Sequence, residues 1–487
     1  MYTPAVLWTS AFCLFDVQSA PFSSAFARKL CNSATDLAFS LPINMRCWAS
    51  IATVVTVVHT ALCLAKMSAT SSLLSPLGFS EAAKAVPLPP SRDPWYTAPE
   101  GFETATPGTV LRLRIAPGNL TSEIVKNATA AYNILYRTAN SHDQPSWAVT
   151  TLFIPTTFYA TPSGKKALVS YQFAYDSADV DSSPSYGFYY ALSQPVPSLN
   201  IPASTDLITQ LLTNGWIVNS PDYEGPSAAF GASIQSGHAT LDALRAVVNL
   251  ANITGLGPLS VAMWGYSGGS IATEAAAELQ PEYAPSLSIS GAVVGGLVDN
   301  ICADYDLFNG TALAGDLVAV VLGLVAQYPE AFAYVRSRLR PETADEFLAA
   351  QHMNTGAVTS FFSSKDIYSY FMGGAADLQA LPLQQVYERE CRLGYYGLPR
   401  IPLFLYKAIG DQYCPISRTD ALASRFCDAG VELTFERNTV GGHVAEIGNA
   451  KPRVFEWLGS IFKETYQTPA GGCSIRDVTV NITGIST

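Results

Sequence analysis

The segment GYSGGS (265–270) contains a serine whose neighbours suit nucleophilic chemistry. Ser267 follows a short apolar run at 259–265 and precedes an alanine- and glutamate-rich, helix-forming segment at 270–280. A serine on a tight turn between a strand and a helix exposes its hydroxyl, and Gly265 and Gly269 leave room for close backbone contacts. The amides at the start of the helix would favour negative charge that develops nearby. The pattern predicts a nucleophile, rather than an ordinary glycine-rich turn or a phosphate loop, because no lysine follows the glycines.

A nucleophilic serine needs a general base, and the chain has five histidines. Where such a serine follows a parallel strand, the chain order is serine, acid, histidine, which leaves His352 and His443. His352, in LAAQHMNTG, is expected at an exposed helical position. His443, in NTVGGHVAEIG, is expected on a glycine-rich loop after the last strand, from which an imidazole can reach back to Ser267. The prediction is that His443 is the base, the alternative being an exposed loop histidine without a role.

The acid that orients the histidine is expected at the end of the preceding strand. Asp411 follows the apolar run IPLFLYKAIG (401–410), and its carboxylate would fix the imidazole tautomer and stabilise the imidazolium. Formation of a Gly-Asp turn is the alternative role, and Asp420 and Glu436 are rival acids. The spacing from Ser267 leaves room for an insertion before Asp411 and for one helix and one strand after it.

An ester oxyanion needs two hydrogen-bond donors, and the backbone N–H of Gly268 is expected to supply one. The second is expected from the loop after ALVSYQFAY (167–175), at Asp176 or Ser177. An ionised Asp176 would repel an oxyanion, so this residue can contribute only through its N–H or as a protonated acid in a dry site. An Asx turn or a helix N-cap is the alternative role of Asp176.

The elements that must position these residues alternate between strand-like and helical segments. Strands are predicted at 146–155, 165–175, 215–225, 259–265, 287–296, 401–410 and 431–437, and helices at 238–251 and 270–280. Apolar runs separated by helices are typical of a mostly parallel sheet covered on both faces. The interval 300–398 breaks this rhythm with helical periodicity and many aromatic residues, so it is predicted to form an inserted helical cap, with 317–326 as part of its core.

Composition excludes several classes of protein. The chain of 487 residues is 48% hydrophobic and 14% charged, which is incompatible with disorder, and its net charge of −11 makes it a poor partner for nucleic acid or an anionic membrane. No Cys-x-x-Cys pair or His/Cys cluster occurs, so neither a metal site nor a cofactor is expected.

The N-terminal region predicts secretion. Residues 45–69 contain Arg46, an apolar run at 51–65 and then small polar residues, as in a signal peptide. We therefore expect the native chain to start at Met45 and residues 1–44 to be a non-native extension, the alternative being a signal anchor with a cytoplasmic tail. Residues 70–105, rich in Pro, Ser and Ala, are expected to form an extended arm.

Secretion is consistent with the cysteines and the glycosylation sequons. Five sequons occur, at Asn119, Asn127, Asn252, Asn309 and Asn481. Five cysteines follow the predicted leader, Cys302, Cys391, Cys414, Cys427 and Cys473, which in an oxidising compartment indicates two disulfides and one free thiol.

The motifs SYQFAYDS, NSPDYEGPSAAFGA, SGHATLDALRA, GYSGGS, GDQYCP and GGHVAEIG occur in an order that resembles the fungal secretory lipase (LIP) family, of the Candida antarctica lipase A type. The resemblance covers about 390 of 487 residues. It implies an α/β-hydrolase fold, with a core of residues 106–299 and 399–487 and a helical cap of residues 300–398. It also implies Ser267, Asp411 and His443 as the catalytic triad, and Gly268 with Asp176 as the oxyanion hole.

The resemblance also bears on the disulfides. The family pattern has a cysteine five residues after the oxyanion-hole Asp, where this chain has Asp181, so that disulfide is missing. Cys427–Cys473 resembles the C-terminal bridge of the family, and Cys302–Cys391 is then predicted as the second pair.

The sequence thus predicts a secreted carboxylic-ester hydrolase, foremost a triacylglycerol lipase, that is monomeric, needs no cofactor and binds a lipid interface transiently. The first alternative is a deacetylase or acyltransferase that acts on a fungal secondary metabolite. The second, from a different class, is a non-catalytic hydrolase-like binding protein.

Overall fold

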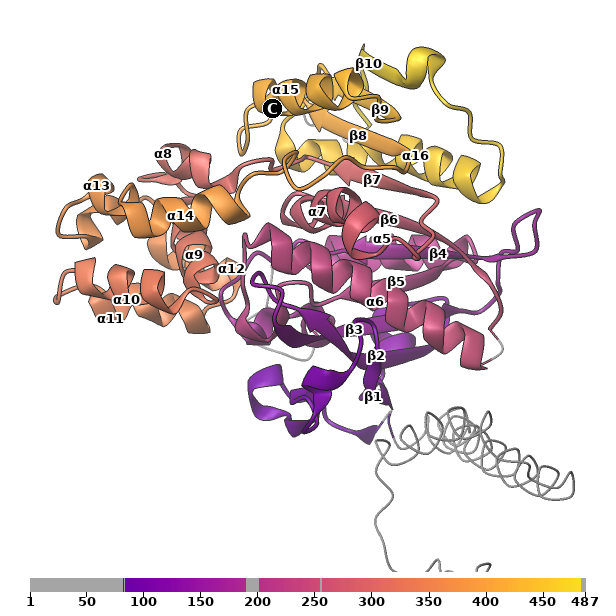
Figure 1. The fold of residues 1–487 in the computed structure, drawn as a ribbon, viewed down its shortest axis with the longest axis horizontal. Helices are drawn as coiled ribbons and strands as arrows, with labels where there is room; N and C mark the ends of the chain where they lie inside the picture. The colour runs from indigo at the N-terminus through magenta and orange to yellow at the C-terminus, as the bar shows by residue number, and fades with distance from the viewer. Residues whose placement is uncertain (1–81, 83, 190–200, 255, 483–487) are drawn as a thin grey trace, which may run out of the picture. The chain divides into compact units, whose positions relative to one another are not determined.

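The computed structural model describes residue 82 and residues 84–189, 201–254 and 256–482 (Figure 1). The predicted extension of 1–44, the predicted signal peptide of 45–69 and the first part of the predicted arm lie outside the described residues. In the part that is described, no helix combines the length and the apolar character that crossing a bilayer requires.

A ten-stranded sheet forms the centre of the described chain, in the order β1-β2-β3-β5-β4-β6-β7-β8-β9-β10. The pairs β1–β2, β2–β3 and β3–β5 are antiparallel. Every further pair along this order, from β5–β4 to β9–β10, is parallel. The strands are β1 (Val110–Ile115), β2 (Ala128–Ala139), β3 (Pro145–Pro155), β4 (Lys166–Gln172), β5 (Ile217–Pro221), β6 (Leu259–Tyr266), β7 (Gly291–Gly295), β8 (Leu403–Ala408), β9 (Leu433–Asn438) and β10 (Cys473–Val478).

Three of these strands, β1, β2 and β10, are absent from the strands that the sequence predicted. In β10, CSIRDV, every residue is exposed or half-buried, because this strand lies at the edge of the sheet. In β1, VLRLRI, every residue is half-buried at the opposite edge, so neither segment forms the continuous apolar run of a buried parallel strand.

Helices cover both faces of the sheet. An added Cβ on Gly265 of β6 would point at the helix that follows Ser267, whereas one on Gly291 of β7 would point at Trp457. Trp457 belongs to α16. Gly265 pairs with Val294, and successive residues of a strand alternate between faces, so Gly265 and Gly291 face opposite sides of the sheet. The helix after Ser267, α7, therefore lies on one face and α16 on the other. The helices outside the insertion are α4 (Pro184–Gly187), α5 (Ile201–Thr213), α6 (Ser233–Thr254), α7 (Gly268–Tyr283), α15 (Ile416–Asp428) and α16 (His443–Phe462).

The insertion between β7 and β8 is a cap of helices, gathered at one side of the sheet in Figure 1. Its helices are α8 (Tyr305–Phe308), α9 (Ala314–Val325), α10 (Pro329–Arg338), α11 (Ala344–Leu348), α12 (Thr355–Phe362), α13 (Ala375–Leu378) and α14 (Leu381–Glu390). All residues of α9 except Asp316 are buried, so the predicted apolar stretch at 317–326 serves as cap core. The Cys302–Cys391 disulfide joins the two ends of the cap, as the sequence predicted, and closes a loop of 89 residues.

The remaining cysteines and the arm are fixed to the core. Cys427 at the end of α15 forms a disulfide with Cys473 of β10, which is the other predicted pair. Cys414 is a buried free thiol. Asp181, at the position where the family has a cysteine, accepts hydrogen bonds from the Ser91 N–H at 2.8 Å and the Ser91 hydroxyl at 2.7 Å. The Asp181 carboxyl group therefore fastens the arm to this position.

Candidate active site

Ser267 occupies a strained turn between β6 and α7. Its backbone angles are φ 55° and ψ −127°, a region that non-glycine residues rarely adopt and that is found at functional turns. A Cβ on Gly265 would lie 2.1 Å from the Gly269 carbonyl oxygen, and one on Gly269 would lie 1.9 Å from the Gln172 carbonyl oxygen. Only glycine fits at either position, because backbone atoms occupy the space that a side chain would need.

Ser267, His443 and Asp411 form one hydrogen-bond chain, called the relay below. The Ser267 Oγ lies 2.8 Å from His443 Nε2, and His443 Nδ1 lies 2.7 Å from Asp411 Oδ2. Both distances are those of direct hydrogen bonds. Each nitrogen of the imidazole therefore has a partner, one a hydroxyl and the other a carboxylate.

His443 is the first residue of α16 and does not lie on a loop, which corrects the expectation from the sequence. The two glycines before it complete the turn after β9, and the helix begins immediately. The N–H of His443 donates to Gln412 Oε1 at 3.1 Å, and its carbonyl accepts a hydrogen bond from the Tyr266 hydroxyl. The Tyr413 ring stacks on the imidazole with centroids 4.5 Å apart. These contacts fix the imidazole more firmly than a flexible loop would.

Asp411 acts both as turn former and as imidazole partner. Its Oδ1 accepts from the N–H groups of Tyr413 and Cys414, while its Oδ2 faces His443. Burial alone would raise the pKa of Asp411, but the hydrogen bond and charge of His443, followed by the charge of Lys407, outweigh it and lower that pKa. The ionised form of Asp411, which stabilises an imidazolium at His443, is thus favoured.

Lys407 is a member of the site that the sequence analysis missed. Its Nζ lies 3.8 Å from Asp411 Oδ2, and both side chains are fully buried. The ammonium also donates to the Leu297 carbonyl at 2.6 Å and to the Thr419 hydroxyl at 3.2 Å. A lone lysine in the otherwise apolar strand LFLYKA was the available signal, since a buried lysine requires a partner.

The rival candidates lie elsewhere. His352 is exposed at the end of a 3₁₀ turn in the cap, and Asp420 of α15 pairs with Arg437 at 3.4 Å. Glu436 of β9 pairs with Arg453 and Arg476. None of the three has a hydrogen bond to the imidazole of the relay within the described part of the chain.

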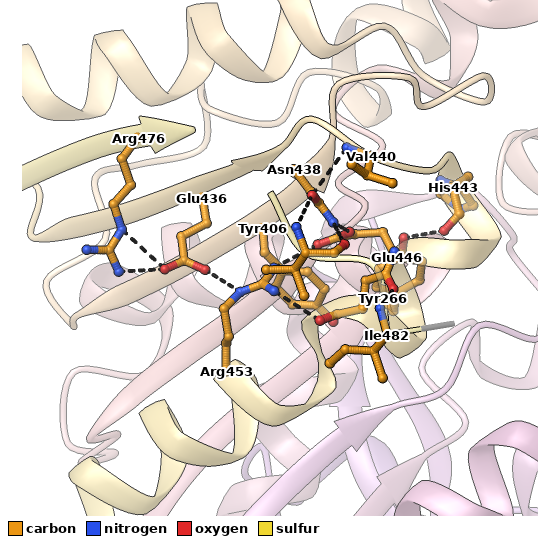
Figure 2. A network of polar contacts seen from close by, with 12 residues as sticks. Tyr266, Tyr406, Glu436, Asn438, Val440, His443, Glu446, Arg453, Arg476 and Ile482 are labelled. Atoms are coloured by element: carbon orange, nitrogen blue, oxygen red, sulfur yellow. Dashed lines mark hydrogen bonds and ion pairs between the residues drawn. The ribbon is translucent and has the colours of Figure 1, made fainter. Parts of the chain in front are cut away.

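Figure 2 shows that Glu436 belongs instead to a polar network behind His443. Arg453 links Glu436 to the buried Glu446, and Glu446 accepts from the amide of Asn438 at 2.5 Å. Asn438 Oδ1 in turn accepts from the Val440 N–H at 3.3 Å. The turn that leads into His443 is therefore fixed by side chains of β9 and α16.

Asp176 lies against the start of α7. Its φ is 46°, and its Oδ1 is buried with no hydrogen-bond partner among the described residues. A Cβ on Gly268 would lie 1.8 Å from this oxygen, so the carboxyl group lies directly against the Cα of Gly268. Burial, and next the charge of Asp316, raise the pKa of Asp176 to about 7. The acid is therefore substantially protonated near neutral pH.

The loop that carries Asp176 is attached to the cap. The Thr355 hydroxyl, at the start of α12, donates to the carbonyl groups of Tyr175 and Asp176, and the Ser177 hydroxyl donates to the Met353 carbonyl. The side chain of Ser177, the other residue considered for the second donor, is thus engaged with the cap.

A cavity of about 160 Å³ opens over the relay. Core residues including Ser267, His443 and Asp176 line one side, and the cap residues Leu313, Asp316, Thr355 and Thr359 line another. Five of its fourteen lining residues are aliphatic, and the others carry hydroxyl, carboxyl or imidazole groups. With this volume the cavity is smaller than a typical ligand pocket of about 300–1,000 Å³.

Buried acids outside the relay predict how stability depends on pH. Burial is the largest cause that raises the pKa to values of about 6 to 8 for six carboxyl groups, Asp176, Asp222, Glu278, Asp304, Asp316 and Glu446. Their unfolded pKa values are near 4, so between about pH 4 and pH 8 the folded state binds more protons than the unfolded state. Stability is then highest below this window and falls as pH rises through it.

We expect the urea midpoint to decrease steadily from pH 5 to pH 8, as followed by tryptophan fluorescence. Asp222→Asn removes one of these titrating groups and should make the decrease shallower. A midpoint that rises from pH 5 to pH 8 would contradict the prediction.

The order of the sheet, the strained serine turn after β6 and the insertion before β8 define an α/β-hydrolase, the fold that the sequence predicted. Residues 192–469 match the family described as Secretory lipase (LIP). This chain belongs to that family and is an ester hydrolase.

Relatives include the Probable trichothecene esterase SAT6 of Stachybotrys chartarum, 49% identical over 86% of this chain and 86% of the relative. The Trichothecene C-3 esterase of Fusarium sporotrichioides is 45% identical over 84% of this chain and 92% of the relative. Among solved structures, Candida antarctica lipase A in its closed state is 27% identical, with a TM-score of 0.72, over 83% of this chain and 92% of that one.

Proposed function

We propose that this protein hydrolyses carboxylic esters through an acyl-enzyme on Ser267. The Ser267 oxygen attacks the ester carbonyl while His443 takes its proton, and Asp411 stabilises the resulting imidazolium. The imidazolium then protonates the leaving alcohol. Water, deprotonated by His443, releases the acid and restores the serine. The observation that carries this proposal is the unbroken hydrogen-bond chain of the relay, and no metal or organic cofactor enters any step.

The oxyanion is proposed to lie beside Gly268 and Asp176. The Gly268 N–H sits at the start of α7, where the helix dipole favours negative charge. The contact between Asp176 and Gly268, together with the raised pKa of Asp176, supports a neutral carboxyl group that donates rather than repels.

Replacing Gly268 by alanine is expected to lower kcat by about 100- to 1,000-fold, the usual loss for one oxyanion donor. The backbone N–H of residue 268 remains in this variant. The added methyl would lie 1.8 Å from Asp176 Oδ1, however, and so would displace the Asp176 carboxyl group, the second proposed donor. Steady-state kinetics on p-nitrophenyl acetate measure the loss. Gly459→Ala is the matched control, because an added Cβ there meets no atom within 4 Å, and it should keep activity. Equal activity of the two variants would contradict this oxyanion site.

The substrate that the site favours is a short-chain ester of a compact, oxygenated fungal metabolite. Two observations support this choice over a long-chain lipid. The relatives at 49% and 45% identity are named trichothecene esterases. The cavity is also small, at about 160 Å³. An acetyl group fits such a space more readily than a long acyl chain.

A triacylglycerol lipase is the second candidate, favoured by the structural similarity to Candida antarctica lipase A. Rates on p-nitrophenyl esters from acetyl to palmitoyl, on triolein and on a trichothecene acetylated at C-3 separate the two. Preference for acetyl esters without triolein hydrolysis supports the metabolite esterase. Preference for palmitoyl and triolein would overturn it. Product analysis with an added alcohol distinguishes hydrolysis from acyl transfer.

A binding protein without catalytic activity is tested separately. An organophosphonate that labels the wild type but not Ser267→Ala supports an active nucleophile, whereas no labelling and no hydrolysis by a folded protein would favour the binding protein.

We further propose that the protein is secreted as a monomer, is glycosylated, and meets a lipid interface only transiently. Of the sequon asparagines, Asn119, Asn127, Asn252 and Asn481 are exposed, while Asn309 is half-buried and bonded to Asp366. Expression from Met45, N-terminal sequencing and the mass change on deglycosylation test leader cleavage and glycan attachment. Gel filtration tests the oligomeric state.

A further inference from the structure

Asp316 is a charged residue in an apolar helix. It is the one charged residue of α9, AGDLVAVVLGLV, and it is also the one residue of that helix that is not buried. Its side chain lines the cavity over the relay, opposite residues of the core. The carboxylate therefore faces the space that a substrate must occupy.

The protein itself supplies little to balance this carboxylate. Thr359 of α12 donates to its Oδ1 at 3.2 Å, and no other donor to it occurs among the described residues. Its neighbours in the cavity include a second acid, Asp176, whose protonation it favours. A carboxylate accepts up to about four hydrogen bonds, so this one has unused capacity on the cavity side.

A structural role alone accounts poorly for the residue. Asp316 lies in the first turn of α9, where an acid favours the helix dipole. An acid on an exposed face of the first turn would interact equally well with the helix dipole, and it would not have to lose its hydration. The half-buried side chain of Asp316 is instead partly dehydrated, which raises its pKa to about 6 although the hydrogen bond from Thr359 lowers it. Ionising this acid therefore costs free energy.

We propose that Asp316 accepts a hydrogen bond from a free hydroxyl group of the substrate beside the scissile ester. This inference rests on the proposed esterase function and specifies its substrate class: partial esters of compact polyols. A fully esterified glycerol has no hydroxyl to donate, whereas a hydroxylated ring that carries one acetyl group does. Asp316 would thus be a specificity residue that the cap contributes to the site.

Two matched pairs of substrates test the proposal. The acetates of cis- and trans-cyclohexane-1,2-diol each carry the hydroxyl, and cyclohexyl acetate lacks it at nearly the same size. We expect the wild type to prefer at least one diol monoacetate over cyclohexyl acetate by about 10- to 100-fold in kcat/KM, the usual range for a hydrogen bond to a charged group.

Substitution at Asp316 should remove the preference for the hydroxyl-bearing substrate. In Asp316→Ala the ratio of kcat/KM for the preferred diol monoacetate to that for cyclohexyl acetate should fall to within about twofold of one. The ratio is the readout, because the charge of Asp316 also acts on Asp176 and its loss can change both rates together. Asp316→Asn preserves the shape of the side chain and should give an intermediate ratio. Asp345→Asn, at an exposed position of α11, is the matched control and should keep the wild-type ratio. Thermal unfolding of each variant establishes that it is folded.

The outcomes separate this inference from the proposed function. Hydrolysis of p-nitrophenyl acetate without a preference for either diol monoacetate would overturn the role of Asp316 and leave the esterase intact. A parallel loss of activity on both kinds of substrate in folded Asp316→Asn would also overturn it. Absence of all ester hydrolysis and of phosphonate labelling would instead overturn the proposed function.

Discussion

Replacing Ser267 by alanine is expected to lower kcat/KM for p-nitrophenyl acetate by about 10⁵-fold, since loss of a serine nucleophile removes the covalent route. The protein should remain folded, because the Ser267 hydroxyl makes one hydrogen bond, to His443, and Ser267 is only half-buried. Alanine can occupy the same turn at no greater backbone cost than serine. Stopped assays at high enzyme concentration are needed to measure the residual rate.

Ser337→Ala, on an exposed turn of the cap helix α10, is the matched control and should retain full activity. A Ser267→Ala enzyme that keeps more than about a tenth of the activity, with an unchanged melting temperature, would show that another group carries the acyl intermediate.

Replacing Asp411 by asparagine is expected to lower kcat by about 10⁴-fold, because an amide NH₂ facing His443 Nδ1 would force the opposite tautomer. Nε2 would then carry a proton and could no longer accept the one from Ser267. The buried Lys407 ammonium would also lose the carboxylate at 3.8 Å, so the melting temperature should fall. Kinetics and thermal unfolding of the same preparation separate the two effects.

The rival acid provides the control for this experiment. Asp420→Asn removes a carboxylate of the same type, which is half-buried and paired with Arg437 at 3.4 Å, and should change kcat by less than about twofold. Equal losses in the two variants would mean that the damage is structural, and a loss confined to Asp420→Asn would reassign the acid.

Local sequence was sufficient to predict the three residues of the relay. Each lies within five residues of the end of a strand, at a turn with a specific residue requirement. These are glycines on both sides of Ser267, a Gly-Asp turn at 411 and paired glycines before His443. Carboxyl ends of parallel strands meet at one edge of a sheet, so correct strands and chain order were enough to bring the three together.

Other parts of the fold were not predictable in this way. The edge strands β1 and β10 carry alternating or polar sequences, and their strand conformation depends on the neighbours with which they pair. The same holds for the placement of His443 on a helix: GGH is compatible with a loop, and only the packing of α16 against the sheet made it the first helical residue.

The protonation of the acids is the clearest case of what the sequence left open. By type, Asp176, Asp316 and Asp411 are identical, yet the pKa of Asp411 is lowered by His443 and Lys407 while burial raises those of Asp176 and Asp316. The sequence by itself determined the family to which the chain belongs and predicted Ser267, His443 and Asp411 as the members of the relay, because those depend on turns and chain order. Only the tertiary structure decided which acids are charged and that the cap places Asp316 over the serine, because dehydration and long-range contacts between distant segments set both.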